Sequence, residues 1–177
     1  MQPYAPFVGV LLLPDRAPFD TTSPVTLSDG QPVASIRWHR WTAKARFDIL
    51  DAVGGVELAR GARQGFFGRR FVVSDPRDQP ILTLEVGFWG VARRCTVTLG
   101  NGQQLFTQGN WTSRRFSVLD GAGQPVARIL NTSKVFSWRP DSFAFELASP
   151  VLSIVQAIGL AQCLRAAVEA QRSASAG

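Results

Sequence analysis

Residues 149–169 read SPVLSIVQAIGLAQCLRAAVE, and most positions of this stretch are apolar. Ser149 is a favoured N-cap residue, and Pro150 suits the first helical position because the N–H that proline lacks would have no partner there. The sequence therefore predicts a helix over residues 150–169. Because a helix that is apolar on every side must be surrounded, either lipid or the rest of the protein has to enclose it.

The chain has 177 residues, enough for one domain with a full core, which we expect to span residues 1–177. Apolar residues make up 45% of it, as in ordinary globular proteins, so global disorder is not expected. The net charge is +6. This basic balance favours anionic partners, either nucleic acid or phospholipid headgroups, without choosing between them.

A strand–turn–strand pattern recurs five times ahead of the helix. The units bend at pairs such as Asp-Gly, Gly-Gly or Asn-Gly, which are typical of β-hairpins. Several carry Gln-Pro just after the bend, so the units look related. A first strand at Phe7–Leu13 and a last strand at Ser142–Leu147 bring the prediction to about twelve strands. The hairpin units are Val25–Ala34, Phe47–Leu58, Phe71–Leu82, Thr96–Phe106 and Phe116–Ala127.

Antiparallel strands with one apolar face tend to close up, because closure removes exposed edges, and a wide barrel cannot fill its interior with its own side chains. A membrane span needs about 20 apolar residues, whereas the apolar run here ends at Arg165. We therefore expect a mainly β, antiparallel closed barrel of about twelve strands around a C-terminal central helix, with no transmembrane segment. Gly159 predicts a close approach of a strand or an aromatic ring, and the small polar tail 170–177 is expected to be frayed.

Three segments carry a resemblance to a known group of proteins: Gly65–Asp75, Arg115–Ala127 and Asp141–Phe145, the last of them just before the helix. With these hairpins and the C-terminal helix, the chain resembles the LURP-one-related family over roughly residues 25–170. Through that family it is similar to the phospholipid scramblases and the Tubby C-terminal domain. The resemblance implies a twelve-stranded barrel around a central helix, and it implies lipid binding by analogy of fold, since Tubby domains bind phosphoinositides. The sequence has no match to the calcium segment or palmitoylation stretch of scramblases, so lipid translocation and calcium dependence are not implied.

Residues suited to catalysis are few. His39 is the only histidine, and within the sequence WHRW it is interpreted as a partly exposed packing residue at a strand end. No nucleophile–base pattern is recognisable, so we expect a non-enzymatic protein with no catalytic residue, no metal site and no cofactor. The paired carboxylates are interpreted as turn residues at hairpin bends, where Asp bonds to the backbone; they are Asp48 with Asp51 and Asp75 with Asp78.

The two cysteines, Cys95 and Cys163, are far apart in the sequence and fall in a predicted strand and in the predicted helix. One such pair in a chain of this size is a poor disulfide framework, so we expect a reducing compartment. The expected location is cytoplasmic, with a peripheral position at a membrane as a further option.

Three arginine doublets stand just before predicted strands: Arg69-Arg70, Arg93-Arg94 and Arg114-Arg115. If the hairpins stack in similar register, the doublets gather near one end of the barrel, where Lys134 and Arg139 of the last loop could join them. Arginines presented together hold phosphate through bidentate hydrogen bonds. Because neighbouring side chains of a strand point to opposite faces, at most one arginine of each doublet can serve a shared site. The alternative interpretation is that these arginines keep the strand edges soluble.

The predicted loops also carry aromatic residues, which suit a membrane interface and base stacking equally well, or could plug the barrel ends. They are Phe66, Phe67, Trp89, Trp111 and Trp138. The leading hypothesis is a binding domain for anionic phospholipid or phosphoinositide headgroups, or for a protein partner at a membrane surface. A nucleic-acid-binding regulatory protein, and a structural domain with only protein partners, stay open as alternatives. The oligomeric state does not follow from the sequence.

Overall fold

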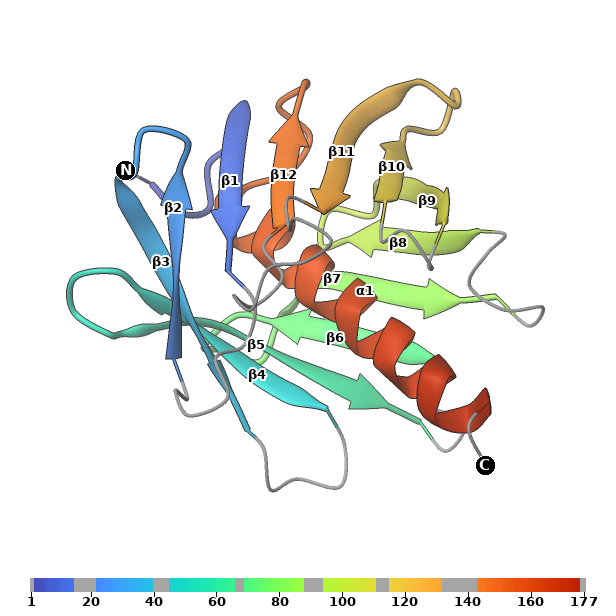
Figure 1. Ribbon diagram of the computed structural model, residues 1–177, viewed down its shortest axis with the longest axis horizontal. Coiled ribbons are helices and arrows are strands. Elements are labelled where there is room, and N and C mark those ends of the chain that lie inside the picture. The colour runs from blue at the N-terminus through green and yellow to red at the C-terminus, as the bar shows by residue number, and fades with distance from the viewer. Residues whose placement is uncertain are drawn as a thin grey trace, which may run out of the picture.

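Among the residues that the computed structural model describes, twelve strands form one closed antiparallel barrel around helix α1 (Figure 1), which confirms the predicted fold class. The described residues are 2–14, 22–39, 45–65, 69–87, 94–110, 115–131 and 143–175. The strands are β1 (Gly9–Leu13), β2 (Thr22–Leu27), β3 (Pro32–Trp38), β4 (Arg46–Asp51), β5 (Glu57–Gln64), β6 (Arg70–Ser74), β7 (Pro80–Val86), β8 (Cys95–Leu99), β9 (Gln104–Asn110), β10 (Arg115–Leu119), β11 (Pro125–Asn131) and β12 (Phe143–Leu147), and α1 is Ile154–Ser175.

Each strand pairs with its neighbours in sequence, and β1 pairs with β12 to close the ring. Because all pairs are antiparallel, every even-numbered strand begins at the same end of the barrel, which we call the loop end. The five predicted hairpin bends lie at the opposite end, which we call the turn end. Closure leaves no unpaired edge that another chain could extend.

Side-chain oxygens build the hairpin turns. Asp75 and Asp120 each accept N–H groups from the residues two and four positions later, at 2.8–2.9 Å. Asn101 and Asp29 accept from the residue two positions later. This is the turn chemistry expected of Asp and Asn, and it confirms Asp75 and Asp78 as residues of a bend.

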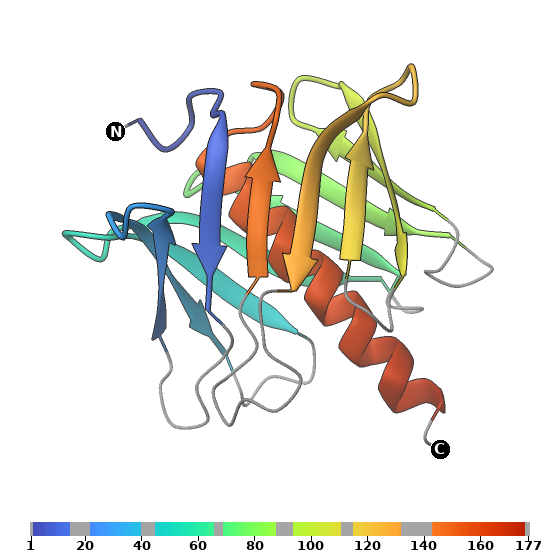
Figure 2. The same ribbon diagram turned by 45° about the horizontal axis from the view of Figure 1, so that its top comes forward.

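The core lies between α1 and the inner wall of the barrel (Figure 2). Phe47, Phe71 and Phe145 are fully buried side chains of the wall, and they meet apolar residues on all sides of the helix. Helix α1 packs mainly against β5 and β7. The surroundings of the apolar helix are therefore the protein itself, as predicted.

The start of the helix differs from the prediction. The N-cap is Ser153 rather than Ser149: Ser153 Oγ accepts the N–H of Gln156 at 3.2 Å, and the Ser153 N–H donates to Gln156 Oε1 at 2.9 Å. This reciprocal capping box satisfies two N–H groups of the first turn. Pro150 lies in the turn before the helix, and Gln156 also donates to the carbonyl of Ile81, which anchors the helix start to β7.

The end of the helix also differs. The tail from residue 170 was expected to be frayed, but α1 continues to Ser175. Arg165 pairs with Glu169 one turn later at 3.3 Å, and Ser173 Oγ donates to the Glu169 carbonyl at 3.1 Å. An ion pair between side chains four positions apart supports the last turns of a helix.

Gly159 lies against β6, which confirms the predicted close approach of a strand. A Cβ atom at this position would come within 3.0 and 3.1 Å of the two methyl groups of Val73. The barrel wall therefore leaves no free space beside this point of the helix.

We expect Gly159→Ala to change the free energy of unfolding by less than about 1 kcal/mol, because the gain in helix propensity is of that size and the crowding against Val73 opposes it. In a Val73→Ala background the crowding is gone, so Gly159→Ala should stabilise by about 1 kcal/mol. Urea unfolding of the four proteins measures the difference. An equal effect of Gly159→Ala in both backgrounds would contradict the packing argument.

Candidate functional site

Four of the eight cationic residues proposed for an anion site are described, and all four stand at the loop end. Arg70 and Arg115 open β6 and β10, while Arg69 and Arg94 immediately precede β6 and β8. The next residues in the chain, Phe71, Cys95 and Phe116, belong to the core. Strand alternation therefore turns Arg70, Arg94 and Arg115 toward the outside of the barrel.

The remaining four, Arg93, Arg114, Lys134 and Arg139, lie outside the described residues. The same holds for the loop aromatics Phe66, Phe67, Trp89, Trp111 and Trp138. Anion binding by all eight cationic residues stays a prediction.

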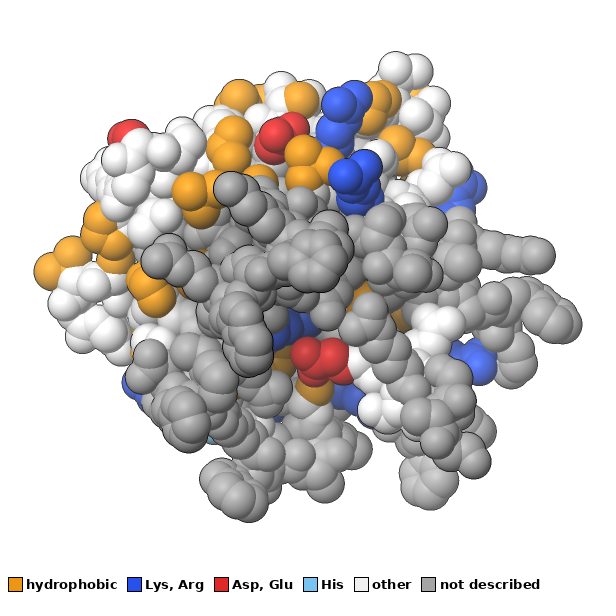
Figure 3. All heavy atoms as spheres, viewed as in Figure 1, with side chains coloured by type: hydrophobic (Ala, Val, Ile, Leu, Met, Phe, Trp, Pro, Cys, Tyr) orange, Lys and Arg blue, Asp and Glu red, His pale blue; other side chains and the backbone are white. Residues whose placement is uncertain are grey.

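A groove of about 590 Å³ lies on the outer wall of the barrel over β9, β10 and β11. We call it the β10 groove. Its polar lining is Gln108, Arg115, Ser117 and Arg128, and its apolar lining includes Leu119, Pro125 and Leu130. Figure 3 shows basic side chains over β10 and β11 with apolar side chains beside them.

The strand register builds this groove. Ser117 of β10 stands directly opposite Gln108 of β9 and Arg128 of β11, so a short side chain lies between two long ones. Arg115 is two residues from Ser117 on the same face of β10. Strands β9 and β10 approach closely at that point, since a Cβ atom on Gly109 would lie 2.2 Å from the carbonyl oxygen of Arg115. The backbone that presents Arg115 is thus tightly packed.

The two arginines of the groove are not neutralised by the described part of the protein. Arg115 and Arg128 are exposed, and neither guanidinium has an ion pair or hydrogen bond to a described residue. Glu146 stands opposite Arg128 in the register of β11 and β12, yet the two form no ion pair. Other arginines do find carboxylates: Arg60 with Glu57, Arg70 with Glu85 and Arg165 with Glu169.

The two ends of the barrel carry opposite charge. The described hairpin bends and the strand ends beside them bear six carboxylates, and Arg77 is the only cation in the bends themselves; the six are Asp29, Asp51, Glu57, Asp75, Asp78 and Asp120. The described arginines cluster toward the loop end; they include Arg37, Arg46, Arg63, Arg69, Arg70, Arg94 and Arg115. A separation of charge along a molecule orients it toward charged surfaces.

The fold is shared with a solved structure. An X-ray structure of an Arabidopsis thaliana protein superposes with a TM-score of 0.61 at 16% sequence identity, covering 92% of this chain and 93% of that chain. At this identity the likeness concerns the fold alone. No protein-family model matches the chain, and no curated protein matches it.

Two kinds of feature are absent from the part of the chain that the structure describes. No helix there combines the length and the apolar character needed to cross a bilayer. No three His, Cys, Asp or Glu side chains in the same part come together where they could hold a metal ion.

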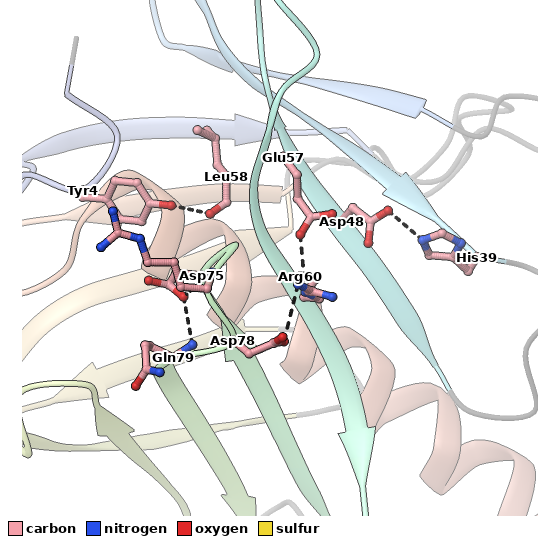
Figure 4. Close-up of polar contacts among 10 residues, drawn as sticks. Tyr4, His39, Asp48, Glu57, Leu58, Arg60, Asp75, Asp78 and Gln79 are labelled. Atoms are coloured by element: carbon pink, nitrogen blue, oxygen red, sulfur yellow. Dashed lines mark hydrogen bonds and ion pairs between the residues drawn. The ribbon is translucent and has the colours of Figure 1, made fainter.

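His39 and Asp48 form a contact that the sequence pattern did not predict. Asp48 was placed at a hairpin bend, but it lies within β4, and its side chain is only 7% exposed. The carboxylate accepts a hydrogen bond from His39 Nε2 at 2.7 Å, as Figure 4 shows. His39 follows β3 and is 31% exposed, so its predicted place at a strand end is correct. The contact fastens the end of β3 to β4, and a His–Asp pair by itself does not make a catalytic site.

Further polar contacts hold the turn end together (Figure 4). Arg60 bridges Glu57 and Asp78 at 3.3 and 3.4 Å, and the Tyr4 hydroxyl donates to the carbonyl of Leu58. Burial raises the pKa of Tyr4, and nearby Asp75 adds to this. The N-terminal segment is thereby attached to β5.

Both cysteines are free and buried, Cys95 in β8 and Cys163 in α1, in the elements that were predicted for them. Burial raises the pKa of both thiols, most strongly for Cys163. Buried thiols held in the protonated form are poor nucleophiles. They therefore act as apolar core residues.

Proposed function

We propose that this protein is a non-enzymatic binding domain that holds anionic phospholipid headgroups at a membrane surface. The observation that carries the proposal is the β10 groove, where Arg115 and Arg128, exposed and without a partner among the described residues, stand beside Leu119, Pro125 and Leu130. A guanidinium binds phosphate through two parallel hydrogen bonds. Apolar side chains next to it suit the less polar part of the same lipid.

The separation of charge between the two ends of the barrel also supports binding to an anionic membrane surface. With the basic loop end toward an anionic bilayer, the carboxylates of the turn end point away from it. Cations near an anionic leaflet contribute about 1 kcal/mol each to binding. Several arginines at the loop end together therefore suffice for a reversible, peripheral association. We also propose that the protein is located in the cytoplasm.

We further propose that the chain is a member of the LURP-one-related group with a Tubby-like barrel. The support is the order of its hairpins, the central helix and the likeness of fold to the Arabidopsis protein. A protein partner at the membrane is the alternative occupant of the groove. Nucleic acid has less support, because Phe116, the one aromatic residue in the described lining of the groove, is buried in the core at 6% exposure and does not offer a ring face on which a base could stack.

The double substitution Arg115→Gln and Arg128→Gln is expected to weaken binding to vesicles of phosphatidylcholine and phosphatidylserine by about thirtyfold, which corresponds to about 2 kcal/mol. The effect should shrink as salt is added, because salt screens exposed charges. Co-sedimentation over a range of lipid concentrations measures it.

Two controls accompany this experiment. Arg77→Gln removes an exposed charge at the turn end and should leave vesicle binding unchanged. A labelled single-stranded oligonucleotide in place of vesicles tests the nucleic-acid alternative. The proposal is refuted if the wild-type protein does not sediment with anionic vesicles at low salt.

A further inference from the structure

The turn between β4 and β5 differs from the other hairpin turns. Val53 is 96% exposed and Val56 is 65% exposed, so this turn presents two large apolar side chains to solvent. The other four hairpin bends contribute none of the large exposed apolar residues in the described chain. We call residues 51–56 the valine turn. In Figure 1 its hairpin projects from the body of the barrel.

The valine turn is built to hold this shape. The Asp51 carboxylate accepts the N–H groups of Gly54 at 2.9 Å and Val53 at 3.2 Å, and the Asp51 N–H donates to the Val56 carbonyl at 2.8 Å. These backbone N–H groups lower the pKa of Asp51, so the turn carries a fixed negative charge. Val53 is thus presented by an ordered backbone, which reduces the entropy lost on docking.

The surroundings of the valine turn decide what kind of surface it can meet. Asp51, Glu57, Asp75 and Asp78 all lie at this end of the barrel. An anionic bilayer would repel them, so the two valines are poorly placed as a membrane wedge. A fitting partner is a protein surface that offers an apolar recess together with unpaired cations.

The β10 groove of a second copy has these properties. It combines Leu119, Pro125 and Leu130 with Arg115 and Arg128, which have no partner in the described part of the chain. We propose that the valine turn of one copy docks into the β10 groove of another, with Val53 and Val56 against the apolar wall and the Asp51 carboxylate toward the arginines. Docking between copies involves the same groove as the proposed lipid binding but does not require lipid. Either proposal can therefore fail without the other.

The topology requires that the valine turn and the β10 groove of such a contact belong to different copies. Strands β4 and β10 stand six places apart in the closed ring of twelve, so turn and groove lie on opposite sides of one barrel. After one such contact the first copy still has a free groove and the second a free turn, so head-to-tail contacts of this kind extend into rows. A single turn in a groove buries less accessible surface than the lower bound of a standard protein interface, which is about 1,200 Å². We therefore expect the association to be weak and reversible.

Sedimentation velocity across a wide concentration range at low salt tests the proposal. The mass of the wild-type protein should rise above 19.3 kDa with concentration. Val53→Asp with Val56→Asp removes the apolar side chains of the valine turn. Arg115→Glu with Arg128→Glu reverses the charge of the β10 groove. Each double variant alone should stay monomeric. Gln31→Asp with Gln103→Asp adds the same two charges on other exposed turns and should associate like wild type.

Mixing the two inactive variants gives the decisive result. One retains a working groove and the other a working turn, so an equal mixture should form pairs of about twice the monomer mass and nothing larger. Circular dichroism confirms that both variants are folded. The valine-turn variant should still sediment with anionic vesicles. A wild-type protein that stays monomeric up to its solubility limit, or a mixture that forms no pairs, overturns the proposal.

Discussion

Removal of residues 150–177 is expected to abolish the folded domain. The segment contributes six large aliphatic side chains that are at most 2% exposed: Leu152, Ile154, Val155, Ile158, Leu160 and Leu164. Burying each is worth about 1.5–3 kcal/mol, so their loss removes at least about 9 kcal/mol. The whole stability of a domain is about 5–15 kcal/mol. The barrel would also be left with an interior that its own side chains do not fill.

Far-UV circular dichroism and dye binding to exposed apolar surface measure the outcome, and we expect an insoluble, unfolded product. A shorter truncation after residue 170 serves as the control. It removes Gln171 and Ser173, which are exposed, and retains Val168, so it should fold. A soluble, cooperatively folding monomer without residues 150–177 would disprove the role of the helix as the filling of the barrel.

Gly61→Ala is expected to destabilise the protein by about 3 kcal/mol, at the upper end of the usual cost of overpacking. A Cβ atom on Gly61 would lie 2.1 Å from Cζ of Phe47 and within 2.6 Å of both Cε atoms. Phe47 is 2% exposed and packs on Trp38, with the ring centres 5.3 Å apart, so the ring has little room to move. With a urea m-value of about 1–3 kcal/mol/M, the midpoint should fall by at least about 1 M.

The matched control is Gly121→Ala, since nothing lies within 4 Å of the added Cβ at that position. Rescue is the stricter test. Phe47→Leu shortens the side chain that faces Gly61, so Gly61→Ala should cost much less in that background, and the cycle should show a coupling of 1 kcal/mol or more, about the range for contacting residues. A Gly61→Ala protein with an unchanged midpoint would mean that β4 and β5 are less closely packed than the structure has them.

The sequence pattern was sufficient for the architecture because its signals are local. A bend such as Asn101-Gly102 and the apolar–polar alternation around it specify a hairpin without reference to the rest of the chain. The apolar run of the helix indicated that the helix cannot lie on the surface of the protein. These two signals together led to a closed barrel with a filled interior.

Local signals failed where two of them competed. Ser149-Pro150 and Ser153 with Gln156 both satisfy the rules for a helix start. Tertiary contacts decide between them, because the Ser149 N–H is bound by the Val126 carbonyl at 3.3 Å and Pro6 bridges to Ser153. Asp48 was misplaced for a related reason, since its partner His39 comes directly after the neighbouring strand β3.

The candidate site also has a part that the sequence predicts and a part that it does not. The arginine doublets were visible, and alternation already limited each doublet to one outward residue. The groove was not visible, because it depends on the register that aligns Gln108, Ser117 and Arg128 across three strands. One signal was available: Arg128 is the only charged residue in the strand Pro125–Asn131.

The pairing of β1 with β12 has a consequence for synthesis on the ribosome. Gly9 is made long before its partner Leu147, and the Phe7 N–H cannot pair until the carbonyl of Leu152 has been made. The five hairpins form from local contacts, but the ring cannot close before β12 has been made. Folding is therefore completed late and depends on contacts between distant parts of the chain, which is slow. Until then the nascent chain exposes strand edges and apolar surface, so it is in this interval that chaperones are most needed.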